Sequence, residues 1–221
     1  KGGSVSWTFS ANAGNGIMIR VGTTNFTPRI KVFGPSNEAL ADVASSSSFN
    51  NDNFVTLQAA SSGTYTVVIS PNFTSQSGSY GLTLAVSPGD FIVPDGDEGG
   101  ALQNGALNSG KMPLGDLDMW SFTANAGDSL MLRAGTTNFT PWIRLYGPDG
   151  TLVSEVKSAS TFNNDNFLTA TATSAGTYTV VVTAAFVTQS GSYGLSLAIA
   201  PGPFVVPDGD EGGALHNGAL N

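Results

Sequence analysis

The sequence lacks several features on which whole classes of protein depend. It has no cysteine, which excludes disulfides and thiolate metal sites. Its 8 basic and 16 acidic residues give a net charge of −8, so it lacks the clustered positive charge that binds phosphate backbones. No apolar run reaches the roughly 20 residues that a membrane-spanning helix needs. We therefore expect neither a nucleic-acid partner nor a membrane span.

Charged residues are also few, at 11 % of the chain, whereas glycine is abundant. Helical proteins of this length carry far more Glu, Lys and Arg, so this composition favours an all-β fold. An acidic surface fits solubility outside a cell and favours hard cations such as calcium, whereas the absence of cysteine does not by itself identify the compartment.

The chain contains a repeat without gaps. The segment PDGDEGGALxNGALN runs from Pro94 to Asn108 and again from Pro207 to Asn221, so counterparts are 113 positions apart. Trp7 corresponds to Trp120 and Tyr80 to Tyr193, and a majority of aligned positions are identical. Such self-similarity indicates tandem structural units.

Each unit reads as a series of short strands. In the first unit VSWTFS alternates, placing Val5, Trp7 and Phe9 on one face, and IMIRV and RIKVF continue the same pattern. Turn signals separate these runs at intervals typical of sandwiches. The fold class that we predict is all-β, with two tandem jelly-roll-like antiparallel β-sandwich modules of seven to nine strands each, followed by a C-terminal donor-strand tail.

The repeat also sets the expected domain boundaries. Residues 1–90 form a first module that lacks its own N-terminal segment, and residues 91–113 form a linking strand segment that completes the second module. Residues 114–203 form that second module, and residues 204–221 form the tail. We expect each module to be large enough to bury a core of its own.

Four runs in the second unit carry a resemblance to a known family. They are GDLDMWSFTANAGDSL (115–130), LYGPDGTLV (145–153), AGTYTVVV (175–182) and GSYGLSL (191–197). In this order they resemble the bacterial pre-peptidase C-terminal domain, a family that also resembles the collagen-binding domains of bacterial collagenases. The resemblance implies a secreted, extracellular or cell-surface bacterial β-sandwich that is accessory or adhesive rather than catalytic.

The resemblance also implies a calcium site, since some relatives bind calcium at an acidic segment followed by a Gly-Asp-x-Asp turn. The first module has Gly3-Ser4-Val5-Ser6 at this turn and offers no carboxylate there. Solvated acidic turns are the alternative, and no other cofactor is expected. The candidate ligands are Asp95, Asp97, Glu98, Asp116, Asp118, Asp208, Asp210 and Glu211.

Catalytic candidates are scarce. The single histidine, His216, lies in the tail, where its counterpart is Gln103. A nucleophile-activating histidine must lie in a formed pocket, and the acidic residues cluster in turns rather than along a cleft. We therefore predict that the chain is not an enzyme.

Two sequence features point to surface contacts. Trp142 and Tyr146 fall on the expected outer face of their strand, where they would stack on a sugar or pack between modules or subunits. The loop FNNDNF occurs unchanged at residues 49–54 and 162–167, and reads either as a tight loop pinned by its phenylalanines or as a polar ligand site.

Two functions remain open. In the first, the protein is a structural subunit of an extracellular filament or surface array, assembled head-to-tail with itself because the tail adds to the first module of another copy. The alternative is a pair of non-catalytic binding modules, cut from a larger secreted protein, whose partner is an extracellular polysaccharide or protein. The tail residues expected to anchor such a joint are Phe204, Val205, Val206, Leu215 and Leu220.

Overall fold

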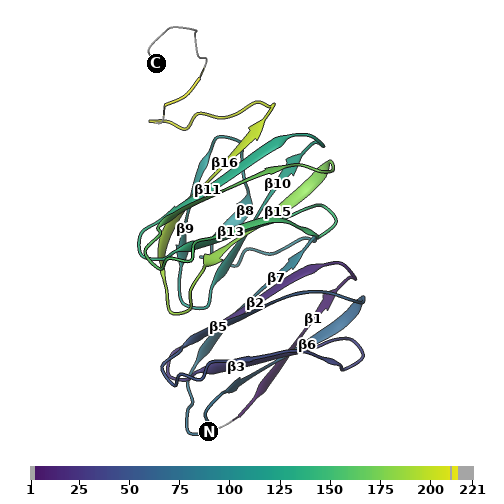
Figure 1. Ribbon diagram of the computed structural model, residues 1–221, viewed down its shortest axis with the longest axis vertical. Coiled ribbons are helices and arrows are strands. Elements are labelled where there is room, and N and C mark those ends of the chain that lie inside the picture. The colour runs from purple at the N-terminus through teal and green to yellow at the C-terminus, as the bar shows by residue number, and fades with distance from the viewer. Residues whose placement is uncertain (1–2, 210, 214–221) are drawn as a thin grey trace.

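A computed structural model describes residues 3–209 and 211–213, and these residues form two β-sandwiches joined end to end (Figure 1). The first sandwich contains seven strands. They are β1 (Val5–Ala11), β2 (Gly16–Thr23), β3 (Pro28–Phe33), β4 (Ala39–Ala44), β5 (Asp52–Gln58), β6 (Gly63–Pro71) and β7 (Tyr80–Ser87). One sheet has the order β1-β6-β3-β4 and the other the order β5-β2-β7.

The second sandwich contains nine strands, two of which come from the linking segment. The linking strands are β8 (Gly99–Ala101) and β9 (Leu107–Met112). The others are β10 (Leu117–Ala124), β11 (Ser129–Thr136), β12 (Pro141–Tyr146), β13 (Leu152–Lys157), β14 (Asp165–Thr171), β15 (Gly176–Ala184) and β16 (Gly191–Ala200). The sheets have the orders β13-β12-β15-β10-β8 and β14-β11-β16-β9. The predicted tandem sandwich architecture is confirmed.

The two linking strands occupy opposite sheets of the second sandwich. Strand β8 pairs with β10, with Trp120 opposite Gly100, and β9 pairs with β16, with Gly191 opposite Met112. The β8–β10 pair is parallel, which departs from the predicted antiparallel arrangement because the linker enters along β10 rather than turning back from it. Segment 91–113 therefore closes one edge of each sheet.

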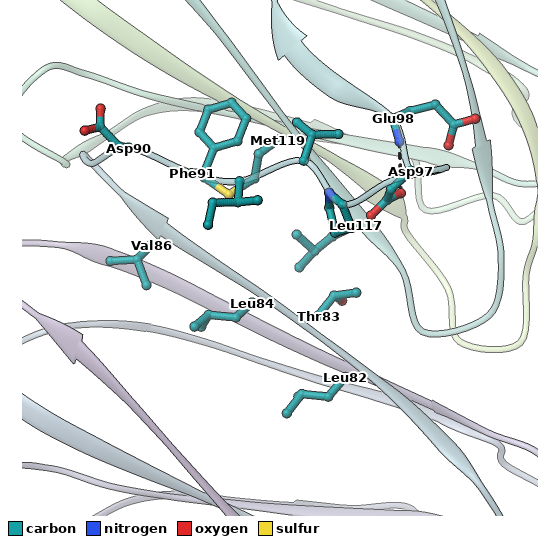
Figure 2. A pocket seen from close by; sticks show the side chains of 13 residues that line it. Leu82, Thr83, Leu84, Val86, Asp90, Phe91, Asp97, Glu98, Leu117 and Met119 are labelled. Carbon is teal, nitrogen blue, oxygen red and sulfur yellow. Dashed lines mark hydrogen bonds between the residues drawn. The ribbon is translucent and has the colours of Figure 1, made fainter.

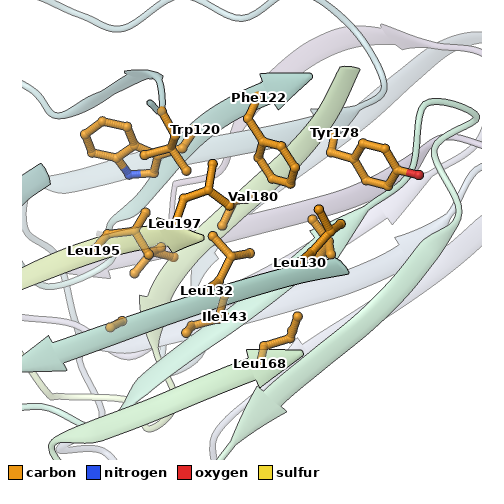
Figure 3. Packing of buried hydrophobic residues seen from close by; sticks show 14 of the residues in the cluster. Trp120, Phe122, Leu130, Leu132, Ile143, Leu168, Tyr178, Val180, Leu195 and Leu197 are labelled. Atoms are coloured by element: carbon orange, nitrogen blue, oxygen red, sulfur yellow. The ribbon is translucent and has the colours of Figure 1, made fainter. Parts of the chain in front are cut away.

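Each sandwich has its own apolar core between its sheets. In the first, Ile17, Ile19, Ile30 and Val32 are fully buried, as their alternation predicts. In the second, Leu102 and Met112 from the linking segment belong to the core cluster. Figure 3 shows Trp120, Phe122 and Leu197 of the same cluster.

One part of the predicted pattern fails. Val5, Trp7 and Phe9 share a face of β1, but Val5 and Trp7 are exposed in the described chain. The first sandwich has no described strand beside β1 that corresponds to β8, nor one beside β7 that corresponds to β9. Within the described residues, therefore, no strand covers the outer edge of β1, although its alternation is that of a half-buried strand.

Candidate functional site

The two sandwiches share an apolar joint. The outer face of β5-β2-β7 contributes Met18, Ala85 and Phe54. The outer face of β10, β12 and β15 contributes Leu117, Met119, Trp142, Tyr146 and Val181. Because both surfaces are removed from water, the joint holds the modules in a defined arrangement.

Trp142 and Tyr146 lie inside this joint. Both are buried, and the rings of Trp142 and Phe54 meet edge-on with centroids 5.3 Å apart. Neither side chain is therefore a free surface for a sugar or a second subunit. Both side chains lie on the outer face of their strand as predicted, and of the two interpretations the structure has the contact between modules, because the neighbouring module covers this face.

A buried ion pair of the first module lies at the joint and is hydrogen-bonded to the second module, and the sequence did not single it out. Arg20 on β2 pairs with Asp52 through both carboxylate oxygens. Its guanidinium also donates to the Thr183 hydroxyl and to the Ala184 carbonyl of the second module, each at 2.6 Å. A buried arginine with its donors satisfied in this way fixes orientation as well as contact.

Three carboxylates gather at the same joint. Asp97 from the linker, Asp116 and Asp118 each offer an oxygen within 4.8 Å of the others. Asp118 is buried on β10, so it is not part of a turn as predicted. Its Oδ2 accepts a hydrogen bond of 2.5 Å from the Tyr193 hydroxyl, whereas its Oδ1 is buried without a hydrogen-bond partner.

Burial and nearby negative charge make the Asp116 and Asp118 carboxyls harder to ionise. Burial, with Asp97 nearby, raises the pKa of Asp116 to about 7. Burial, with Asp116 nearby, raises the pKa of Asp118 to about 8 against the lowering effect of the Tyr193 hydrogen bond. A positive charge close to Asp116 and Asp118 would favour their ionised forms.

The group fits a hard divalent cation. All three donors are carboxylate oxygens, and the unpartnered Oδ1 of Asp118 leaves a buried lone pair available. Calcium prefers six to eight oxygens, so three carboxylates would supply part of its ligand set. In the first module the counterparts of Asp116 and Asp118 are Gly3 and Val5, which provide no such group.

Most other predicted ligands lie outside the group of three carboxylates. Asp95 is exposed, and Glu98 lies near enough to act on the Asp116 and Asp118 carboxyls only through charge. In the tail, Asp208 and Glu211 are exposed. Asp210 lies outside the described residues.

The described part of the tail starts beside the second module. The Val205 amide donates to the Asn104 carbonyl at 2.8 Å, and the Asn104 side chain donates to the Pro203 carbonyl. The side chains of Phe204, Val205 and Val206 are exposed. Leu215 and Leu220, the remaining predicted anchors, lie outside the described residues, as does His216.

The linker also borders a cavity of about 380 Å³ beside the joint. Figure 2 shows Phe91 and Met119 on one side of it and Leu82, Leu84 and Val86 of β7 on the other. Strand β7, at the edge of its sheet, therefore presents an apolar surface next to the linker.

The repeated FNNDNF loops differ in one respect from the prediction that their phenylalanines pin them. Their first phenylalanines, Phe49 and Phe162, are 89 % and 91 % exposed, so they do not pin the loops. Polar groups fix the loops instead: Asn53 donates to the Pro28 carbonyl, and Asn166 donates to the Pro141 carbonyl. Each loop therefore exposes a phenylalanine ring, and hydrogen bonds fix the loop backbone next to it.

The described residues contain no helix that could cross a bilayer. The fold defines the protein as a tandem pair of β-sandwich modules. The chain belongs to the family of bacterial pre-peptidase C-terminal domains, whose model matches residues 3–71 and 116–184. No curated protein matches the chain.

Solved structures offer weaker likenesses. One is the M60 catalytic domain with the CBM51-1 and CBM51-2 domains from Clostridium perfringens ZmpB, at 7 % identity and a TM-score of 0.28 over 89 % of this chain and 34 % of that one. Another is infectious bursal disease virus, Gt strain, at 16 % identity and a TM-score of 0.26 over 86 % and 58 %. The chain thus spans about a third to little more than half of these structures, and scores this low carry no functional argument.

Proposed function

We propose that the chain is a non-catalytic binding unit of a secreted bacterial protein. The observation that carries this proposal is the pair of exposed phenylalanines, Phe49 and Phe162, at the same position of both modules. An exposed ring on a fixed loop loses little conformational entropy on binding and can stack on a sugar ring or an apolar side chain. The partner would be an extracellular polysaccharide or protein.

The rigid joint supports binding at two points. Arg20, Asp52 and the apolar cluster hold the two sandwiches together, so the two loops keep a fixed separation. Two linked sites of modest affinity give a high combined affinity for a polymer with repeating ligands. A single exposed ring would give only weak attachment.

Calcium is part of the same proposal. Asp97, Asp116 and Asp118 would hold the ion, whose charge would offset their repulsion at the point where the linker meets β10. The ion would thereby stiffen the joint between the modules.

Retention on insoluble polymers tests the binding function. We expect the intact protein to sediment with at least one of cellulose, chitin and fibrous collagen. The double variant Phe49→Ala, Phe162→Ala should lose at least about tenfold in retention, and each single variant should lose less. Ile92→Ala is the matched control, since Ile92 is as exposed but lies in the linker. Equal retention of the double variant and the control would contradict the proposal.

Assembly into a filament or surface array is a separate hypothesis, because it requires the first module to accept a segment of a second copy. The unpaired edges of β1 and β7 in the described chain are the specific observation that favours it.

A further inference from the structure

We infer that two copies of this chain associate head-to-tail through a joint that repeats the one between the two modules. Residues 204–221 of one copy would seat on the open edges of the other copy's first module. At the same time, the outer face of β14-β11-β16 would pack against the outer face of β1-β6-β3 of that module. This inference goes beyond ligand binding and does not depend on it.

The acceptor edge is formed in the first module. Trp7 is 51 % exposed, whereas its counterpart Trp120 is 5 % exposed beneath the linking segment. A cavity of about 120 Å³ opens beside Val5, lined also by Phe26, Ile69 and Tyr80. In the second module, the counterparts Phe139, Val182 and Tyr193 share a core cluster with Leu102 and Met112. The first module thus lacks, within the described chain, the apolar side chains that fill this region in the second.

The occupant is indicated by the repeat itself. Gly99 must be glycine, because a Cβ there would lie 2.5 Å from the Met119 carbonyl oxygen of the neighbouring strand. The tail keeps this glycine as Gly212, and the residues that follow it, Gly213, Ala214 and Leu215, repeat Gly100, Ala101 and Leu102. By the same register, residues 212–214 would pair in parallel with residues 6–8 of the second copy.

The linker also shows which tail residues would anchor the joint. Leu102, the counterpart of Leu215, is buried, and Phe91, the counterpart of Phe204, is partly buried against the joint. Ile92 and Leu107, the counterparts of Val205 and Leu220, are exposed. Leu215 and Phe204 would therefore carry most of the contact, and the five predicted anchors are not equivalent.

A second surface matches the first joint. Met131, Arg133, Asp165 and Phe167 on the outer face of the second module correspond to Met18, Arg20, Asp52 and Phe54. The first set is exposed, with Met131 at 42 % against 1 % for Met18. Arg133 pairs with Asp165 as Arg20 pairs with Asp52. The same ion pair is therefore present on a face of the second module that is exposed in the described chain.

The facing surface of the first module provides the complementary groups. Thr183 and Ala184, which accept hydrogen bonds from Arg20, correspond to Ser70 and Pro71. A serine hydroxyl and a main-chain carbonyl are thus available to Arg133 of another copy. Arg29 stands in the place of Trp142, and an arginine over the Phe167 ring is also favourable.

The geometry of the chain makes this contact heterologous. The two sandwiches are stacked, and the start of β1 and the described part of the tail lie at opposite ends (Figure 1). Such a contact leaves one acceptor edge and one donor tail free in every dimer, so association would continue beyond two copies.

Sedimentation velocity of the intact chain over a wide concentration range tests the inference. We expect the mass to rise with concentration through successive multiples of the monomer. Deletion of residues 204–221 should hold the protein at the monomer mass. Because a truncated chain can fail for other reasons, a second variant keeps the tail and carries a copy of residues 91–113 ahead of Lys1. This copy should occupy the acceptor edge in cis and also abolish association.

A matched pair of surface variants distinguishes association through the β14-β11-β16 face from non-specific hydrophobic association. Met131→Asp should weaken association at least about tenfold, whereas Leu152→Asp should leave it unchanged. Both side chains are 42 % exposed, but Leu152 lies on β13, in the other sheet. A chain that stays monomeric at every concentration would overturn the inference. So would association that survives either the deletion or the added segment, whatever the outcome of the polymer-retention experiment.

Discussion

Trp7 and Trp120 occupy the same position of the repeat and make the same hydrogen bond in different surroundings. Each indole donates to a tyrosine hydroxyl, at 2.9 Å to Tyr80 and at 3.0 Å to Tyr193. Trp120 is buried because Leu102 belongs to its core cluster, whereas Trp7 is half exposed. The linking segment therefore accounts for the main difference between two otherwise similar modules.

This difference predicts unequal costs of truncation. Trp120→Ala should lower the free energy of unfolding by about 3–5 kcal/mol, because it leaves a cavity in a closed core. Trp7→Ala should cost no more than about half as much, because water already reaches the ring. Urea denaturation of both variants measures the two costs, and equal costs would contradict the role given to the linking segment.

The repeated ion pair gives a second matched comparison. Arg20→Ala should destabilise the protein by about 3–5 kcal/mol, because it leaves the Asp52 charge buried and unpaired. Arg133→Ala removes the equivalent arginine of an exposed pair and should cost less than about 1 kcal/mol. Denaturant unfolding at dilute protein distinguishes them, and a large loss in Arg133→Ala would show that burial at the joint is not the cause.

The close pairing of β8 with β10 predicts different effects on stability for substitutions at two glycines. Gly99→Ala should destabilise the second module by about 1–3 kcal/mol, because its φ is +149° and a Cβ would collide with the Met119 carbonyl. Gly135→Ala is the control, since a Cβ at Gly135 meets no atom within 4 Å. Thermal unfolding of both variants is the measurement. A tolerated Gly99→Ala would argue against close pairing of the two strands.

Calcium should stabilise the folded protein if the proposed site binds it. Added calcium should raise the Tm, since a ligand that binds only the folded state shifts the unfolding equilibrium. Asp118→Asn should remove this increase, and Asp95→Asn should retain it because Asp95 lies outside the group of three carboxylates. Calorimetry with and without a chelator provides the check. A rise in Tm that persists in Asp118→Asn would place the ion elsewhere.

The fold could be predicted because strand alternation is a local property of the sequence and the repeat can be read directly from it. Ile17, Ile19, Ile30 and Val32 face the core as their spacing requires. Whether an outer face is buried or exposed could not be predicted in this way, because its burial depends on whether another module covers it. Trp142 is the clearest case: a tryptophan in the place of Arg29 indicated a contact, but alternation alone placed it on the outside.

The candidate sites were predicted in part for similar reasons. The acidic segment and the turn were both recognised, but only the register of β8 on β10 brings Asp97 to Asp116 and Asp118 and excludes Asp95. Arg20 and Asp52 gave no distinguishing signal, because Arg133 and Asp165 repeat them on an exposed face. The outward direction of Phe49 and Phe162 is likewise set by hydrogen bonds at the base of each loop, which sequence spacing does not reveal.

Head-to-tail association requires an open edge in the first module that accepts a segment like the linker. The direct measurement is Trp7 fluorescence, taken as the difference between the intact protein and Trp7→Phe, while a synthetic peptide of residues 91–113 is added. Saturable binding with a shift of the Trp7 emission to shorter wavelength, absent with a peptide carrying Leu102→Asp, is the predicted result. An unchanged Trp7 emission at saturating peptide would contradict the account.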